Sequence, residues 1–117
     1  LVVEDNPTTR TSLVESLNSL NYEVIEARNG EEALTGWVRH RDRIALVLTD
    51  LVMPDLGGRD LACELRARGA SVSIILLSGR LMADTAEGLA DDVITAWVHK
   101  PVDLRHLAEV VAEHVAG

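Results

Sequence analysis

The chain of 117 residues has a formal net charge of −8, and hydrophobic residues make up 47% of it. That size and composition indicate one domain with a real core and argue against disorder. The negative charge argues against direct nucleic-acid binding, which needs positive charge to neutralise phosphates, and no apolar stretch approaches the roughly 20 residues that cross a membrane.

Five short apolar runs, separated by helix-like segments, predict five strands. The runs are residues 1–3, 22–27, 45–49, 73–77 and 95–99. The first run is so short that we expect its strand to be cut off at the start, as in one module of a longer protein. The run at 45–49 has no polar alternation, as expected when both faces of a strand are covered.

Five helices are expected between and after these strands. Asn6 and Pro7 suit the cap and first turn of the first helix, and Asp103 suits the cap of the last. Residues 81–90 contain Gly88 and many small side chains, so they predict only a poor helix. In the other four helices, the residues expected to face the core are Leu13, Leu17, Leu20, Ala33, Leu34, Trp37, Val38, Leu61, Ala62, Leu65, Leu104, Leu107, Ala108, Val111 and Val115.

Cys63 and Val110 are two further apolar residues of the helical segments. We expect the Cys63 thiol to be buried and inert. Because it is the single cysteine, no internal disulfide can form, which suits a reducing compartment, and we expect a cytoplasmic protein. Val110 lies off the expected inner face of the last helix, either as an ordinary exposed valine or as part of a partner surface.

Strands that alternate with helices predict a doubly wound α/β fold. We expect one domain over residues 1–117, with a flavodoxin-like parallel sheet of five strands in the order 2-1-3-4-5 and five helices. Ligands bind beyond the carboxyl ends of the strands in such sheets. The polar residues at the ends of four of these strands are Glu4, Asp5, Asp50, Ser78 and Lys100. We therefore expect these side chains to share one rim.

Three carboxylates at one rim favour a divalent cation, because Glu4, Asp5 and Asp50 would otherwise repel one another. Mg²⁺ prefers oxygen ligands and retains several waters. We expect Asp5 and Asp50 to bind it directly and Glu4 to bind directly or through water. The backbone carbonyl of Val52 would complete the protein ligands.

Asp50, at the end of the most apolar central strand, is the candidate nucleophile. A carboxylate that attacks phosphorus forms an acyl phosphate, and the transferring group needs cations and donors around its spread negative charge. Lys100 suits one phosphoryl oxygen and the Ser78 hydroxyl another. Each residue alone has an ordinary explanation as a cap, turn or loop residue. Their joint placement at strand carboxyl ends favours the functional interpretation.

With these residues in place, nearly all of the chain resembles a receiver domain of bacterial two-component signalling. The matching positions are the acidic pair Glu4-Asp5, the phosphoacceptor Asp50, the loop residues Met53-Pro54 and Gly58, the switch hydroxyl Ser78, and Lys100-Pro101. The resemblance implies phosphoryl transfer from a histidine kinase or a histidine phosphotransfer domain, with Mg²⁺ required. It implies an acceptor module rather than an enzyme. Residues 48–58 and 76–79 resemble receivers of hybrid sensor histidine kinases, although a free-standing or effector-linked receiver stays open.

The resemblance also implies a switch, in which phosphorylation draws Ser78 inward and an aromatic residue on the last strand follows. That residue is Trp97 here, where tyrosine or phenylalanine is commoner, so Trp97 is either a switch or a fixed packing residue. Val52 and Arg80 flank the expected path of hydrolytic water. Because valine has no hydrogen-bonding side chain, we expect a fairly long-lived phosphoryl group.

Three other functions fit the sequence less well. A flavodoxin-like cofactor binder has the same fold, but Glu4 and Asp5 would repel the phosphate of a flavin. A degenerate receiver would dock partners without phosphorylation, which the intact set of site residues argues against. A phosphatase of the aspartyl-nucleophile type would need a second aspartate where Val52 stands.

Overall fold

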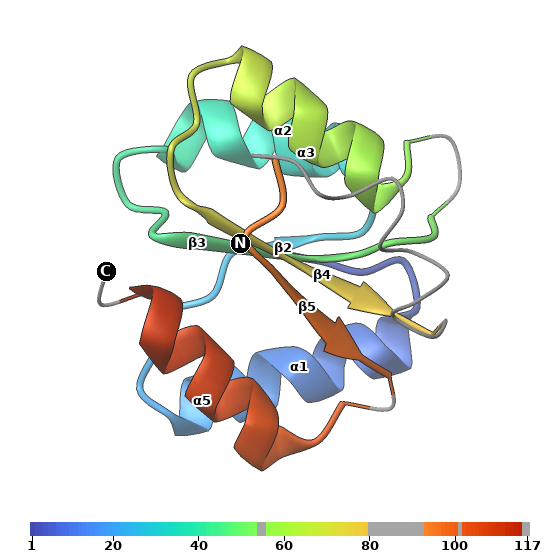
Figure 1. The fold of residues 1–117 in the computed structure, drawn as a ribbon, viewed down its shortest axis with the longest axis vertical. Helices are drawn as coiled ribbons and strands as arrows, with labels where there is room; N and C mark the ends of the chain where they lie inside the picture. Colours follow the sequence, from blue (N-terminus) through green and yellow to red (C-terminus); the bar gives the residue numbers. More distant parts are fainter. Residues whose placement is uncertain (54–55, 80–92, 101, 116–117) are drawn as a thin grey trace.

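The structure, a computed structural model, describes residues 1–53, 56–79, 93–100 and 102–115. Its strands are β1 (Val2–Val3), β2 (Glu26–Ala27), β3 (Leu46–Asp50), β4 (Ser73–Ser78) and β5 (Ala96–His99), and its helices are α1 (Pro7–Ser19), α2 (Gly30–His40), α3 (Gly58–Ala67) and α5 (Leu104–Val115). The sheet lies between two helical layers, with α2 and α3 on one face and α1 and α5 on the other (Figure 1). No helix in these described stretches has the length and apolar character that a bilayer span requires.

The sheet is parallel throughout and has the order β2-β1-β3-β4-β5. This confirms the predicted strand order. The register aligns Val3 with Thr49, Asp50 with Leu77 and Ser78 with His99, so the carboxyl ends of neighbouring strands meet at one edge. The helix expected at residues 81–90 lies outside the described residues, and the other four predicted helices are present.

Two hydrophobic clusters flank the sheet, one on each face. Side chains alternate along a strand, so Val47 and Ile74 pack with the cluster under α2 and α3, whereas Leu48 and Ile75 pack with the cluster under α1 and α5. All four are almost fully buried. The continuous apolar runs therefore reflect strands covered on both sides, as the sequence predicted.

The helix starts next to the carboxyl edge are fixed by side-chain caps. Asn6 accepts hydrogen bonds from the backbone N–H groups of Thr8 (2.9 Å) and Thr9 (3.1 Å), which fixes the start of α1 just after β1. Asp103 accepts one from the N–H of Arg105 at 2.9 Å, at the start of α5. Both predicted caps are confirmed, and each removes an otherwise unsatisfied donor from a helix terminus.

Two predictions for α2 and α3 are wrong. Cys63 is exposed rather than buried, because the inner face of α3 is formed by Leu61, Ala62 and Leu65 and the next residue points away from it. Val38 on α2 is 60% exposed for the same reason, since it follows the buried Trp37. A lone exposed valine is normal at a protein surface.

The predicted inner face of α5 is wrong at two positions. Leu104, in the first turn, is 49% exposed, whereas Val110 is buried. The inner stripe is centred on Leu107, Val110 and Val111, which contact the cluster beneath α1 and α5. Val110 therefore belongs to the core and is neither an exposed valine nor part of a partner surface. Leu20, at the end of α1, is also partly exposed (36%), against expectation.

Candidate functional site

The sequence-predicted site residues come together at the carboxyl edge of the sheet. Glu4 follows β1, Asp50 ends β3, Ser78 ends β4 and Lys100 follows β5. The strand pairing continues beyond the labelled strands, because the N–H of Lys100 donates to the carbonyl of Ser78 at 2.7 Å. The backbone thus holds these side chains in a row along one rim.

The acidic cluster consists of Glu4, Asp5 and Asp50, each of which offers a carboxylate oxygen within 4.8 Å of the others. Glu4 is 1% exposed and Asp50 is 8% exposed, whereas Asp5 is open to solvent. Burial raises the pKa of Glu4, and the neighbouring charge of Asp50 raises it further. Hard oxygen donors that repel one another at this spacing fit a divalent cation such as Mg²⁺.

Lys100 lies between two of these carboxylates. Its Nζ is 3.1 Å from Oδ1 of Asp50 and 3.5 Å from Oε2 of Glu4. Burial opposes the charged form of Lys100, but the hydrogen bond and charge of Asp50, together with Glu4, raise its pKa above the ordinary 10.5. The ammonium therefore stays charged and offsets part of the repulsion within the acidic cluster.

Glycine lets α3 approach the backbone of Asp50 closely. A Cβ at Gly58 would clash with the carbonyl oxygen of Asp50 and with the Leu76 side chain, 2.9 Å away. The N–H of Gly58 also donates to the carbonyl of Leu51 at 2.8 Å. The position of α3 and the position of the candidate nucleophile are therefore coupled.

Ser78 and Trp97 lie on the same face of the sheet by strand alternation. Leu77 and Val98, next to them in sequence, both pack in the cluster under α1 and α5, so Ser78 and Trp97 are directed to the opposite face. Ser78 is buried and Trp97 is partly exposed on the edge strand β5. This placement is compatible with Trp97 as a switch residue and with Trp97 as a fixed packing residue.

Val52 lies just after β3 and is 65% exposed. This exposed side chain is apolar and has no group that can hydrogen-bond water. Its backbone carbonyl stays a candidate ligand on sequence grounds alone.

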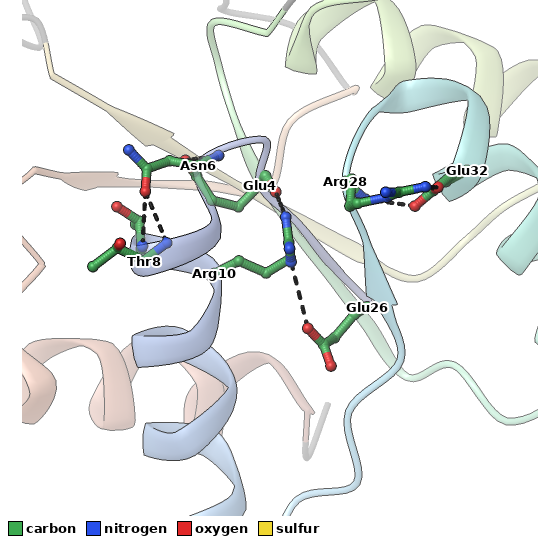
Figure 2. Close-up of polar contacts among 8 residues, drawn as sticks. Glu4, Asn6, Thr8, Arg10, Glu26, Arg28 and Glu32 are labelled. Carbon is green, nitrogen blue, oxygen red and sulfur yellow. Dashed lines mark hydrogen bonds and ion pairs between the residues drawn. The ribbon is translucent and has the colours of Figure 1, made fainter.

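The sequence reasoning missed Arg10 of α1. Its Nη1 donates to the backbone carbonyl of Glu4 at 3.0 Å, and its Nε is 3.4 Å from Oε1 of Glu26 (Figure 2). The only signal was a basic residue near the start of the capped helix. Nothing in a side-chain pattern marks a bond to a backbone carbonyl.

A cavity of about 290 Å³ lies at the opposite edge of the sheet. Mainly apolar residues line it, among them Leu1, Leu46 and Val111, and none of the site residues takes part. The acidic cluster is therefore not part of this cavity.

The family model described as the response regulator receiver domain matches residues 1–112. The chain belongs to this family, and it is a receiver domain of two-component systems.

Relatives and solved structures agree with that assignment. The chain is 34% identical over 113 residues to the sensor kinase CckA of Brucella abortus, a match that covers 97% of this chain and 12% of that protein. A response regulator receiver protein from Pseudomonas putida aligns with TM-score 0.85 and 34% identity over 96% of this chain and 93% of that one. The response regulator TrrA from Thermotoga maritima, solved with Mg²⁺-BeF, aligns with TM-score 0.84 and 32% identity over 96% and 94% of the two chains.

Proposed function

We propose that the chain accepts a phosphoryl group on Asp50 from the phosphohistidine of a histidine kinase or a histidine phosphotransfer domain. The observation that carries the proposal is the pairing of Asp50 with Lys100 at 3.1 Å inside an acidic cluster. A carboxylate that only capped a helix would need neither the Lys100 ammonium nor the two neighbouring acidic residues.

Mg²⁺ is the cofactor that the donor set fits. Glu4, Asp5 and Asp50 would hold it, together with the backbone carbonyl of Val52. When bound, the cation would neutralise charge on the carboxylates and on the incoming phosphoryl group. The likeness to TrrA, whose solved form contains Mg²⁺-BeF, supports this choice.

In the transfer step, an oxygen of Asp50 forms a bond to phosphorus while the bond from phosphorus to the imidazole nitrogen breaks. The imidazole leaves with that electron pair and is protonated by solvent. Lys100 would neutralise one phosphoryl oxygen, and the Ser78 hydroxyl would donate to another. The chain contributes position and charge, and the donor supplies the energy, so we describe it as an acceptor module rather than an enzyme.

The switch would use the shared face of Ser78 and Trp97. Movement of Ser78 toward the phosphoryl group would open space on the face to which Trp97 is directed. If Trp97 turns inward, phosphorylation should shift the emission of Trp97 in a Trp37→Phe variant. An unchanged spectrum would leave Trp97 a packing residue.

The phosphoryl group would be long-lived because Val52 cannot hydrogen-bond the attacking water. A Val52→Asn variant should lose its phosphoryl group faster than the unmodified chain, measured as the decay of the phosphorylated mass. Equal decay rates would remove Val52 from the explanation.

The parent protein would be a hybrid sensor histidine kinase. The first two curated relatives are sensor kinases, and the chain spans 12% of the length of each. Because the histidine kinase that supplies the phosphoryl group would use ATP, the module would lie in the cytoplasm. Neither nucleic acid nor a membrane would contact the module directly.

The test is intact mass after incubation with acetyl phosphate, with and without Mg²⁺, on this chain and on Asp50→Asn. One phosphoryl increment that needs both Mg²⁺ and Asp50 is expected. Asp42→Asn, at an exposed aspartate outside the site, is the matched control and should behave like the unmodified chain. No increment under any condition would favour a docking module that works without phosphorylation.

A further inference from the structure

We propose that Arg10 is a positioning residue for the cation site, because it fixes the peptide group between Glu4 and Asp5. The inference rests on the proposed function, since it concerns the carboxylates that would hold Mg²⁺. It adds a residue of α1 that itself offers no ligand atom to the cation.

The guanidinium of Arg10 reaches from the helix to the end of β1. Nη1 donates to the Glu4 carbonyl at 3.0 Å, and the side chain is 15% exposed. On the other side of the same residue, the N–H of Glu4 donates to the carbonyl of Ala27 in β2 at 3.1 Å. Glu4 is therefore held at its N–H by the sheet and at its carbonyl by α1. Figure 2 shows the second of these contacts.

The Glu4 carbonyl and the Asp5 N–H belong to one planar peptide group. A bond that holds the carbonyl therefore also holds the plane from which Asp5 continues. Asp5 is exposed, so its side chain is placed mainly by the backbone on either side of it. On the far side, Asn6 caps α1 and its N–H donates to Oε1 of Glu4 at 3.3 Å.

An ordinary ion pair with Glu26 is the competing explanation for Arg10. That contact is longer, at 3.4 Å, and the Glu26 side chain is 52% exposed. Exposed pairs of this kind contribute little. The shorter bond is made to a backbone carbonyl beside a buried carboxylate, and a charged donor strengthens it. The carbonyl contact therefore explains the burial of Arg10 better than the ion pair does.

Charge and position make opposite predictions for cation binding. The positive charge of Arg10 lies close to the acidic cluster and repels Mg²⁺. Removal of that charge alone would therefore tighten Mg²⁺ binding. Loss of the fixed peptide plane would weaken binding, since residues that orient metal ligands typically contribute about 10–100-fold to affinity. The direction in which Mg²⁺ affinity changes therefore shows whether Arg10 acts mainly through its charge or by positioning the peptide group.

The experiment is calorimetric titration of the full chain with Mg²⁺, in the absence of any phosphoryl donor. Arg10→Met should weaken binding by about tenfold or more, and Arg10→Lys, which keeps one donor and the charge, should restore part of it. Two controls should bind as the unmodified chain does. Glu26→Gln removes the ion pair and leaves the carbonyl bond, and Arg28→Met removes an exposed arginine whose Nη2 lies 2.7 Å from Glu32.

Circular dichroism establishes that each variant is folded at the titration temperature, and Arg10→Gln replaces Arg10→Met if the latter is not. Unchanged or tighter binding by the folded Arg10 variants, beside normal binding by the unmodified chain, would overturn the positioning role alone. Absence of Mg²⁺ binding by the unmodified chain would overturn the proposed function, and this inference with it.

Discussion

The two edges of the parallel sheet bury different kinds of side chain. At the amino edge, a cavity of about 290 Å³ is lined mainly by apolar side chains, with the charged Arg43 and Glu23 at its margin. At the carboxyl edge, Glu4, Asp50 and Ser78 are buried among the strand ends, at 1%, 8% and 1% exposure. The side-chain charges of Arg43 and Glu23 face water, whereas the charged side chains at the carboxyl edge are held together by the fold.

This difference predicts that substitutions at the two edges have different effects. Burial and the charge of Asp50 raise the pKa of Glu4, so the ionised form of that carboxylate is less favourable in the folded chain than in the unfolded chain. Proteins commonly keep such unfavourable groups where they bind a ligand. We therefore expect changes at the carboxyl edge to alter stability and cation binding together, and changes at the amino edge to alter neither much.

The largest effect is expected from Lys100→Met. Removal of the ammonium leaves Glu4 and Asp50 buried without a positive partner, and loss of one member of a buried pair typically costs about 3–5 kcal/mol. Lys100 is itself 27% exposed, so the lower end, about 3 kcal/mol, is expected in the free energy of unfolding measured with urea. Since its pKa is raised, the contribution is fully present below pH 10.5 and is lost as pH rises through the folded value.

In the Lys100→Met variant, bound Mg²⁺ would replace the missing positive charge. Mg²⁺ should raise the melting temperature of this variant more than that of the unmodified chain, because binding to the folded state alone stabilises it. Lys100→Arg, which keeps a charge, should show no such enhancement. An equal Mg²⁺ effect in all three proteins would mean that Lys100 does not offset the acidic cluster.

The next effect is expected from Gly58→Ala. The added Cβ would meet the Asp50 carbonyl oxygen, a backbone atom that cannot turn away. Overpacking of this kind typically costs about 1–3 kcal/mol, and the shift should also slow phosphorylation of Asp50. Gly36→Ala is the matched control, since its nearest atoms are 3.8 Å away, and alanine within a helix should stabilise by about 0.5–1 kcal/mol. Urea unfolding of both variants is the measurement.

A gain in stability is expected from Glu4→Gln without added cation. The folded chain raises the pKa of Glu4 above its ordinary 4.5, so folding is opposed as pH rises through the folded value, and the full cost persists above it. The neutral amide removes this cost. Melting temperatures should therefore be higher than those of the unmodified chain at pH 7 and should converge with them toward pH 4.

The same Glu4→Gln variant should bind Mg²⁺ at least tenfold more weakly, because a neutral amide oxygen replaces a carboxylate. Higher stability with weaker binding is the signature of a group kept for function. Lower stability at pH 7 would mean that the Lys100 contact at 3.5 Å outweighs burial and repulsion.

The strand order and the main site residues were predictable from sequence because both depend on short-range patterns. Strands buried on both faces are continuous apolar runs, and parallel strands bring their following residues to one edge. Glu4, Asp50 and Lys100 meet for that reason. The exact face of each helix was less predictable, as Cys63 and Val110 show, since a shift of one position rotates a side chain by about 100°.

Arg10 could not be predicted in the same way. Its main partner is the Glu4 carbonyl, and every residue has a carbonyl, so sequence offers no sign of which one is used. Only the packing of α1 against the end of β1 determines that choice.

The smallest effect is expected from Arg43→Ala at the amino edge. Nη2 of Arg43 lies 3.4 Å from Oε2 of Glu23, but the two side chains are 66% and 91% exposed. Water screens such a pair, so the free energy of unfolding should change by less than about 0.5 kcal/mol and Mg²⁺ binding should not change. A loss comparable with that of Lys100→Met, or a change in Mg²⁺ affinity, would show that the two edges are coupled through the sheet. The expectation that the amino edge is independent of the cation site would then be wrong.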